Sequence, residues 1–197
     1  MNEVGNLTGN AGKNSIIWHS TDLGVLGAWT DGTDNWVSLG IGYKDDWTMA
    51  GCGDFNGDGK DSVLMSFMGA AYYTVDIDGT GTDGVATLLT TSDSNWTVRA
   101  TGDFSGDGKD DIVAYNASAS LVAMWGDGDA VNPWSLLGML DKNDWFIVGA
   151  GDYNGDKKDD LLVRQKSTGM LGYYASGNLE QWNVLGYGVD MNWTVIA

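Results

Sequence analysis

A nine-residue acidic motif occurs three times in this chain and sets the period of the whole sequence. It reads Gly-Asp-Phe-Asn-Gly-Asp-Gly-Lys-Asp from Gly53, Gly-Asp-Phe-Ser-Gly-Asp-Gly-Lys-Asp from Gly102 and Gly-Asp-Tyr-Asn-Gly-Asp-Lys-Lys-Asp from Gly151. Successive copies are 49 residues apart, and the 197 residues hold four such intervals. Self-similarity at a period of this length indicates a repeat architecture in which each repeat is one supersecondary unit.

Two further series of residues keep the same period. The first is Trp47, Trp96, Trp145 and Trp193, and the second is Trp36, Val85, Trp134 and Trp182, each followed three residues later by leucine. A repeated position usually serves a repeated core, so we expect the first series to pack between repeats.

The pattern of each repeat predicts four short strands. A tryptophan-led apolar run precedes the acidic motif, a second run follows it, a third ends at a glycine-containing turn, and the fourth carries Trp-x-x-Leu-Gly. Short runs rich in valine, leucine and aromatic residues, bounded by Gly, Asp and Asn, are typical of strands and hairpins, and no segment keeps a 3.6-residue period. The sequence therefore predicts an all-β fold with little helix, a β-propeller of four four-stranded blades.

The two ends of the chain suggest how the blades close. The chain opens in a motif-like loop without carboxylates, residues 5–15, and closes on a first-strand sequence, residues 193–197. We predict one domain, residues 1–197, with blade units 1–46 plus 192–197, 47–95, 96–144 and 145–191. In this scheme the C-terminal strand pairs with the N-terminal unit, which lacks a first strand, and removes an exposed edge. The alternative is a piece cut from a longer array at a repeat boundary.

Small residues on the first strands bear on the oligomeric state. A four-bladed ring crowds these strands near its axis, and Gly51, Gly53, Ala100, Gly102 and Ala150 suit that crowding. They favour a monomeric four-bladed ring over a dimer in which two chains complete an eight-bladed ring.

The net charge of −17 and the pI of about 4.1 limit the partners. A polyanion is repelled by nucleic acid and by anionic membranes, so neither is an expected partner. No apolar stretch approaches the roughly 20 residues that a membrane helix needs. The N-terminal residues have no secretion signal, and the sequence leaves open whether one has been removed.

The acidic motif has the composition of a metal loop. Oxygen-bearing side chains fall at alternate positions, which a tight loop turns toward one point, and Gly108 permits the bend. Hard oxygen ligands without histidine or thiolate suit calcium. The ligands predicted for the second copy are Asp103, Ser105, Asp107, the backbone carbonyl of Lys109, and Asp111. The twelfth position, a bidentate Glu in an EF-hand, is Met65, Ala114 or Val163 here, so the loop leads into a strand.

These motifs resemble the FG-GAP and VCBS repeats of integrin-type calcium-binding β-propellers. The resemblance covers essentially the whole chain and implies one calcium in each loop between the first and second strands. It implies two further ligand sets: Asp54, Asn56, Asp58, Lys60 and Ser62, and Asp152, Asn154, Asp156, Lys158 and Asp160.

The copies of the loop are not equal. Ser62 leaves the first with one carboxylate fewer, and Lys157 stands where the family has glycine, at a cost of about 1 kcal/mol. We expect about three structural calcium ions, with the loop of residues 103–111 the tightest and the N-terminal loop empty.

The sequence contains few of the residues and motifs that common enzyme mechanisms need. His19 is the only histidine, which excludes most Ser-His-Asp schemes, and we expect it to be a packing or surface residue. There is no Gly-x-Ser-x-Gly elbow or phosphate loop. Abundant carboxylates remain compatible with glycoside chemistry. We predict that the chain is not an enzyme.

The tryptophans are the better functional signal. Trp36, Trp134 and Trp182 are expected at the outer rim, where indole faces stack on sugar rings. The resembling family includes carbohydrate-binding lectins. The sequence thus predicts a calcium-stabilised, non-catalytic module that binds glycans or proteins. The alternatives are a propeller domain of a polysaccharide lyase or hydrolase, and a structural spacer. Loops of this type load at the millimolar calcium of extracellular fluid, so we expect an extracellular or cell-surface protein.

Overall fold

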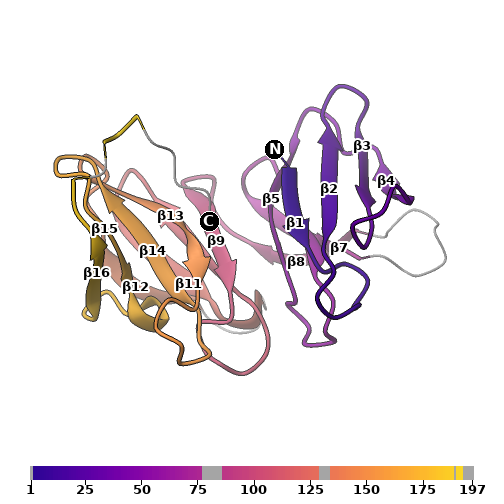
Figure 1. Ribbon diagram of the computed structural model, residues 1–197. Helices are drawn as coiled ribbons and strands as arrows, with labels where there is room; N and C mark the ends of the chain where they lie inside the picture. Colours follow the sequence, from indigo (N-terminus) through magenta and orange to yellow (C-terminus); the bar gives the residue numbers. More distant parts are fainter. Residues whose placement is uncertain (1, 77–85, 129–133, 189, 193–197) are drawn as a thin grey trace. The chain divides into compact units, whose positions relative to one another are not determined.

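The computed structural model describes residues 2–76, 86–128, 134–188 and 190–192, and its sixteen strands form four antiparallel sheets (Figure 1). The first sheet contains β1 (Asn2–Gly5), β2 (Ser15–Ser20), β3 (Val25–Trp29) and β4 (Trp36–Ile41). The second contains β5 (Trp47–Gly53), β6 (Ser62–Phe67), β7 (Ala71–Val75) and β8 (Ala86–Thr91). The third contains β9 (Trp96–Gly102), β10 (Asp111–Asn116), β11 (Leu121–Trp125) and β12 (Ser135–Met139). The fourth contains β13 (Trp145–Gly151), β14 (Asp160–Gln165), β15 (Leu171–Tyr174) and β16 (Trp182–Gly186).

Each sheet keeps its strands in chain order, which is the meander of a propeller blade. The prediction of an all-β propeller fold with four four-stranded blades is confirmed. Helix in the described part of the chain is limited to two single 3-10 turns, η1 (Gly126–Gly128) and η2 (Ala175–Gly177). Among these residues there is no helix with the length and apolar character to cross a membrane.

The N-terminal sheet corrects one prediction. Its first strand is β1, which pairs antiparallel with β2 from Asn2 opposite Trp18 to Gly5 opposite Ser15. The sheet is therefore complete without the C-terminal segment, and the prediction that it lacks a first strand is wrong. The tryptophan pattern does not identify β1, because this strand lacks the tryptophan that begins the other first strands. Residues 193–197, the predicted closing strand, lie outside the described residues.

The chain divides into two compact units, Met1–Ser94 and Asn95–Ala197, each built from two successive sheets. In the first unit Ile17 of β2 and Met65 of β6 belong to one buried apolar cluster. In the second unit Val113 of β10 and Val163 of β14 do the same, and the first strands β9 and β13 lie side by side. Each core therefore forms between two blades.

The second strands show how sequence follows burial. β10 is buried along its whole length and is apolar at every position from Ile112 to Tyr115, as expected for a strand covered on both faces. β2 alternates instead, with Ile17 buried and Ile16 and Trp18 exposed at 40% and 36%.

A repeated hydrogen bond ties each of three blades to the segment that follows its fourth strand. The fifth residue of the second strand donates to a backbone carbonyl: His19 Nε2 to Tyr43 O, Tyr115 OH to Leu140 O, and Arg164 Nη2 to Asp190 O, each at 2.7 Å. His19 thus occupies a position that tyrosine and arginine fill in other blades.

The first-strand tryptophans pack partly as predicted. Trp47 and Trp145 pack against the cores between the blades of their units. The ring contacts of Trp96 are with Trp125 and Trp134 of its own sheet, at centroid distances of 6.3 and 5.8 Å. Trp193, the fourth member, lies outside the described residues.

Candidate functional site

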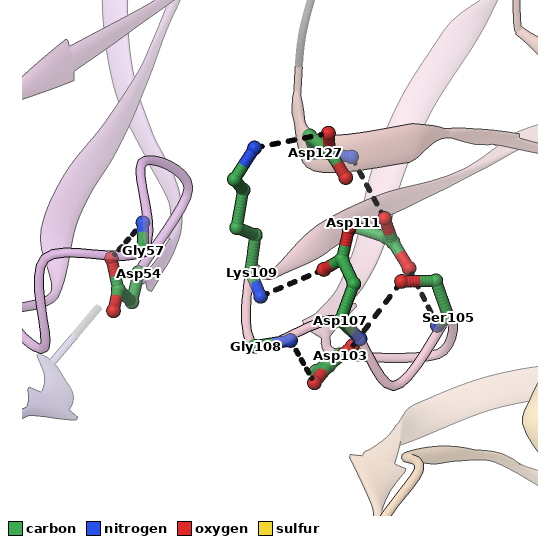
Figure 2. A network of polar contacts seen from close by, with 9 residues as sticks. All are labelled: Asp54, Gly57, Asp103, Ser105, Asp107, Gly108, Lys109, Asp111 and Asp127. Carbon is green, nitrogen blue, oxygen red and sulfur yellow. Dashed lines mark hydrogen bonds and ion pairs between the residues drawn. The ribbon is translucent and has the colours of Figure 1, made fainter.

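The first aspartate of each acidic loop organises the turn around itself. Asp103 follows β9, and its Oδ1 accepts hydrogen bonds from the backbone N–H of Gly106 at 2.6 Å and of Asp107 at 3.1 Å. Its Oδ2 accepts from the N–H of Gly108 at 2.9 Å (Figure 2). Asp54 and Asp152 make the same three bonds in their own loops.

The backbone bends where the sequence predicts it. Gly59 and Gly108 have φ of 82° and 88°, in the left-handed region that glycine enters without a Cβ penalty. Lys157 has φ of 70° at the same place, so it accepts the unfavourable conformation expected of it.

The remaining alternate positions lie close to the first aspartate. Ser105 Oγ donates to Asp103 Oδ1 at 3.4 Å, and Asp107 Oδ1 accepts from the Lys109 N–H at 2.9 Å. That backbone hydrogen bond is the main cause that lowers the pKa of Asp107 below its usual value. In the other loops the amide Nδ2 of Asn56 and of Asn154 donates to the next aspartate.

The closing aspartates are buried and tie the loop to another turn. Asp111 Oδ2 accepts from the Ser105 N–H at 3.1 Å, and its Oδ1 accepts from the N–H of Asp127, after β11, at 2.8 Å (Figure 2). Burial raises the pKa of Asp111. Asp160 bonds to the N–H groups of Tyr153 and Ser176 in the same way. In the first loop Ser62 instead donates its hydroxyl to Asp76.

Two aspartates that we did not predict as site residues join successive blades. Asp159 Oδ2 accepts from the backbone N–H of Asp103 in the preceding loop at 2.9 Å, and the Asp159 N–H donates to Asp103 O. Asp61 makes the same pair of bonds with Asn6. We call Asp61 and Asp159 the inter-blade aspartates. The repeated final Asp of the motif was the sequence signal that could have identified them.

The inter-blade aspartates also explain a motif glycine. A Cβ on Gly102 would lie 2.4 Å from Asp159 Oδ2, and one on Gly5 would lie 3.0 Å from Asp61 Oδ2. Glycine at the start of the motif leaves room for the next blade's carboxylate.

The N-terminal loop, residues 6–15, has the same connection without carboxylates of its own. Asp31, in the turn after β3, accepts hydrogen bonds from Thr8 Oγ1 and from Asn10 Nδ2, the second at 2.7 Å. The Thr8 hydrogen bond is the main cause that lowers the pKa of Asp31.

The predicted ligands are of the kind that calcium takes. Each acidic loop offers carboxylate, amide or hydroxyl, and carbonyl oxygens, and Asp111 and Asp160 are fully buried carboxylates. Among the residues that the structure describes, no three side chains of His, Cys, Asp or Glu are grouped so that they could hold an ion. The donor set thus fits calcium in chemistry.

The three rim tryptophans are placed on fourth strands but not in one site. Trp36 begins β4 and Trp134 directly precedes β12, with exposed fractions of 46% and 51%, whereas Trp182 begins β16 and is half-buried. Trp182 packs against Trp145 and Tyr174 at centroid distances of 5.3 and 5.0 Å. Each therefore stands in its own sheet.

Comparison with known proteins identifies the repeat. Residues 103–163, which contain the second and third acidic loops, match the model of the FG-GAP-like repeat family. With the four four-stranded blades, this match confirms the resemblance to FG-GAP-type propellers.

Other comparisons add little. No curated protein matches the chain in sequence. Among solved structures, the chain is similar to the crystal structure of the rhamnogalacturonan lyase YesW, at 16% identity with a TM-score of 0.37. The match covers 83% of this chain and 40% of the lyase chain, so the chain spans less than half of that protein. A likeness this weak says nothing about activity.

Proposed function

We propose that this chain is a calcium-stabilised, non-catalytic binding module that works outside the cytosol and recognises glycans or proteins. The observation that carries the proposal is the acidic loop that occurs three times in the chain. In each copy the first aspartate accepts hydrogen bonds from three backbone N–H groups, and side chains with oxygen atoms follow at alternate positions.

Calcium would be held by the loops in unequal strength. In the tightest, Asp103, Ser105, Asp107, Asp111 and the Lys109 carbonyl would hold the ion. The loop of residues 152–160 has a matching set, and that of residues 54–62 is weaker by one carboxylate at Ser62. The ion supplies positive charge that offsets the repulsion among these carboxylates and fixes the connection between the first and second strands.

Recognition would use the exposed rim aromatics. Trp36 and Trp134 present indole surface on fourth strands, and an indole face stacks on the apolar face of a sugar or packs into a protein pocket. The chain's net charge of −17 argues against nucleic acid and anionic membranes as partners. A monomer is the proposed state.

A glycan-array screen with and without calcium tests the proposal. We expect binding in calcium, reduced binding after chelation, and loss in Trp134→Ala. Met139→Ala is the matched control, because Met139 is exposed at 72% in β12 of the same sheet but has no aromatic face. Glycan and protein-ligand screens that are both negative in calcium would contradict the recognition role. Calorimetry without a calcium signal would contradict the metal role separately.

A further inference from the structure

A cavity of about 280 Å³ lies within the second unit, between the third and fourth sheets. It opens where β13 begins, whereas the acidic loop of residues 152–160 follows the other end of that strand. Its volume of about 280 Å³ is slightly below the range of about 300–1,000 Å³ typical of small-molecule sites, so it suits a small ligand such as one sugar ring. The wall combines three cationic side chains with three aromatic ones: Arg99, Lys142, Lys166, Tyr115, Trp145 and Phe146.

The cations are the unusual part of this wall. The chain has ten Lys and Arg residues against 27 Asp and Glu, yet three of the ten converge here. The one ion pair found among the described residues is between Lys109 and Asp127. Arg99, Lys142 and Lys166 therefore have no described carboxylate within ion-pair distance.

Hydrogen bonds restrain the lysine side of the cavity. Lys166 Nζ donates to the backbone carbonyl of Lys142 at 2.9 Å, which joins the β14–β15 turn to the β12–β13 connection. The carboxylate of Asp144 lies in the same region, but its oxygens accept from Gln165 Nε2 and from the backbone and hydroxyl of Ser167. The Ser167 hydroxyl is the main cause of its lowered pKa, and the positive charge of Lys166 lowers it further. Lys166 forms no ion pair with a described carboxylate, so its positive charge remains available at the cavity.

The aromatic residues provide a fixed apolar wall. Tyr115 is 8% exposed and its hydroxyl is used on Leu140 O, so it offers ring carbons to the cavity. Trp145 is held edge-to-face by Trp182 at 85°. Phe146 is half-buried beside it. Such rings present apolar surface at little entropic cost.

We propose that this cavity binds a carboxylate-bearing sugar ring, as in a uronic acid. The cations would pair with the carboxylate while the aromatic wall packs against the C–H face of the ring. The side-chain lining favours a carboxylate over a phosphate, because the described residues that line the cavity include no helix N-terminus and no glycine loop that would direct backbone N–H groups into it. The cavity wall includes no acidic-loop residue and neither of the exposed tryptophans Trp36 and Trp134, so the site can be tested independently of the function proposed above.

Nuclear magnetic resonance of the full chain in saturating calcium tests the site. Sodium glucuronate, glucose and sodium sulfate are titrated separately, and the indole N–H signal of Trp145 reports binding in the cavity. We expect glucuronate to shift this signal with an affinity at least about tenfold above that of glucose or sulfate, a factor worth one charged contact.

Charge-neutral variants locate the site. The double variant Lys142→Gln/Lys166→Gln and the single variant Arg99→Gln should each weaken glucuronate binding about tenfold or more. Lys13→Gln/Lys44→Gln changes the net charge equally at exposed positions of the first unit and should bind as the parent does. Melting curves of the variants check that each is folded.

Three results would overturn the proposal. The first is no shift of the Trp145 signal by glucuronate. The second is sulfate binding as tightly as glucuronate, which would mark a simple anion site. The third is equal weakening in the two double variants, which would mark a general effect of net charge.

Discussion

The N-terminal loop and the loop of residues 103–111 make the same connection between a first and a second strand by different means. In the loop of residues 103–111, Asp103 accepts hydrogen bonds from backbone N–H groups, and Asp111 joins the loop to the turn after β11. The N-terminal loop has no carboxylate of its own, its one charged side chain is Lys13, and the carboxylate comes from Asp31 in the turn after β3. Asp31 and Asp127 both lie two residues beyond a third strand and share a left-handed φ, of 57° and 55°.

This difference shows that the blade requires its loop to be held by hydrogen bonds but does not require carboxylates within the loop. A loop without carboxylates can bond to one carboxylate from another turn, whereas the three predicted carboxylate ligands of residues 103–111 concentrate negative charge that a cation would offset. The inter-blade aspartates serve both kinds, because Asp61 bonds to Asn6 and Asp159 to Asp103. We therefore expect calcium to stabilise the individual acidic loops without being required for the fold as a whole.

The largest expected effect is that of removing calcium. A ligand at 100 times its dissociation constant stabilises the folded state by about 2.7 kcal/mol. For a chain of this size 1 kcal/mol corresponds to about 2–4 °C in Tm, so even one lost site should lower Tm by about 5–10 °C. Scanning calorimetry with and without a chelator measures this. A Tm that is the same with and without the chelator would contradict the proposal that calcium stabilises the structure.

A second effect comes from the inter-blade aspartates. Asp159→Ala leaves the Asp103 N–H without its carboxylate partner, which should cost about 1–3 kcal/mol in the free energy of unfolding. Asp61→Ala should cost about as much, although Asp61 bonds to the loop without carboxylates. Denaturant unfolding in chelator measures both variants. If only Asp159→Ala is destabilising, the two loops are not held alike between blades.

A third, smaller effect distinguishes the calcium dependence of the loop of residues 103–111 from that of the N-terminal loop. Asp107→Asn keeps the size of the side chain and removes one charged ligand. A tenfold loss of calcium affinity is worth about 1.4 kcal/mol, and so about 3–6 °C in Tm, when calcium is saturating. Asn10→Ala, at the corresponding place in the N-terminal loop, should lower Tm equally with and without chelator. Equal behaviour of the two variants would remove the distinction between the loops.

The smallest effect is a pH dependence at Asp31. The pKa of Asp31 is lowered in the folded state because Thr8 donates a hydrogen bond to the carboxylate. A lowered pKa of an acid contributes stability that is fully present above the unfolded value and is lost as the pH falls through the folded value. Asp31→Asn should therefore flatten part of the fall in Tm below about pH 4. Parallel acid titrations in chelator compare the variant with the parent, and superimposable curves would exclude this role.

The second blade shows what a repeat pattern misses. Tyr73 pairs with Met65 on the second strand, at the place where Gly27 pairs with Trp18 and Gly172 with Val163. A Cβ on Gly27 or Gly172 would collide with the indole of Trp36 or Trp182.

Tyr73 can take that place because the fourth strand of its blade is different. Ala86 is the residue opposite Val75, and the ring of Tyr73 lies 5.0 Å from that of Trp47. The packed sheet thus shows that the large side chain of Tyr73 compensates for the small residue on the fourth strand of its blade.

The amino-acid sequence by itself determined the period, the four strands of the three blades that begin with a tryptophan, the turn at Gly108 and the strained Lys157, because these depend on neighbouring residues. Only the tertiary structure decided which carboxylates hold which turns. Asp31 meets Thr8 across 23 positions and Asp159 meets Asp103 across 56, and no local pattern encodes such pairs. It also gathered Arg99, Lys142 and Lys166 around one cavity. Antiparallel pairing and blade packing bring together residues far apart in the chain, and a pattern read along one strand cannot include them.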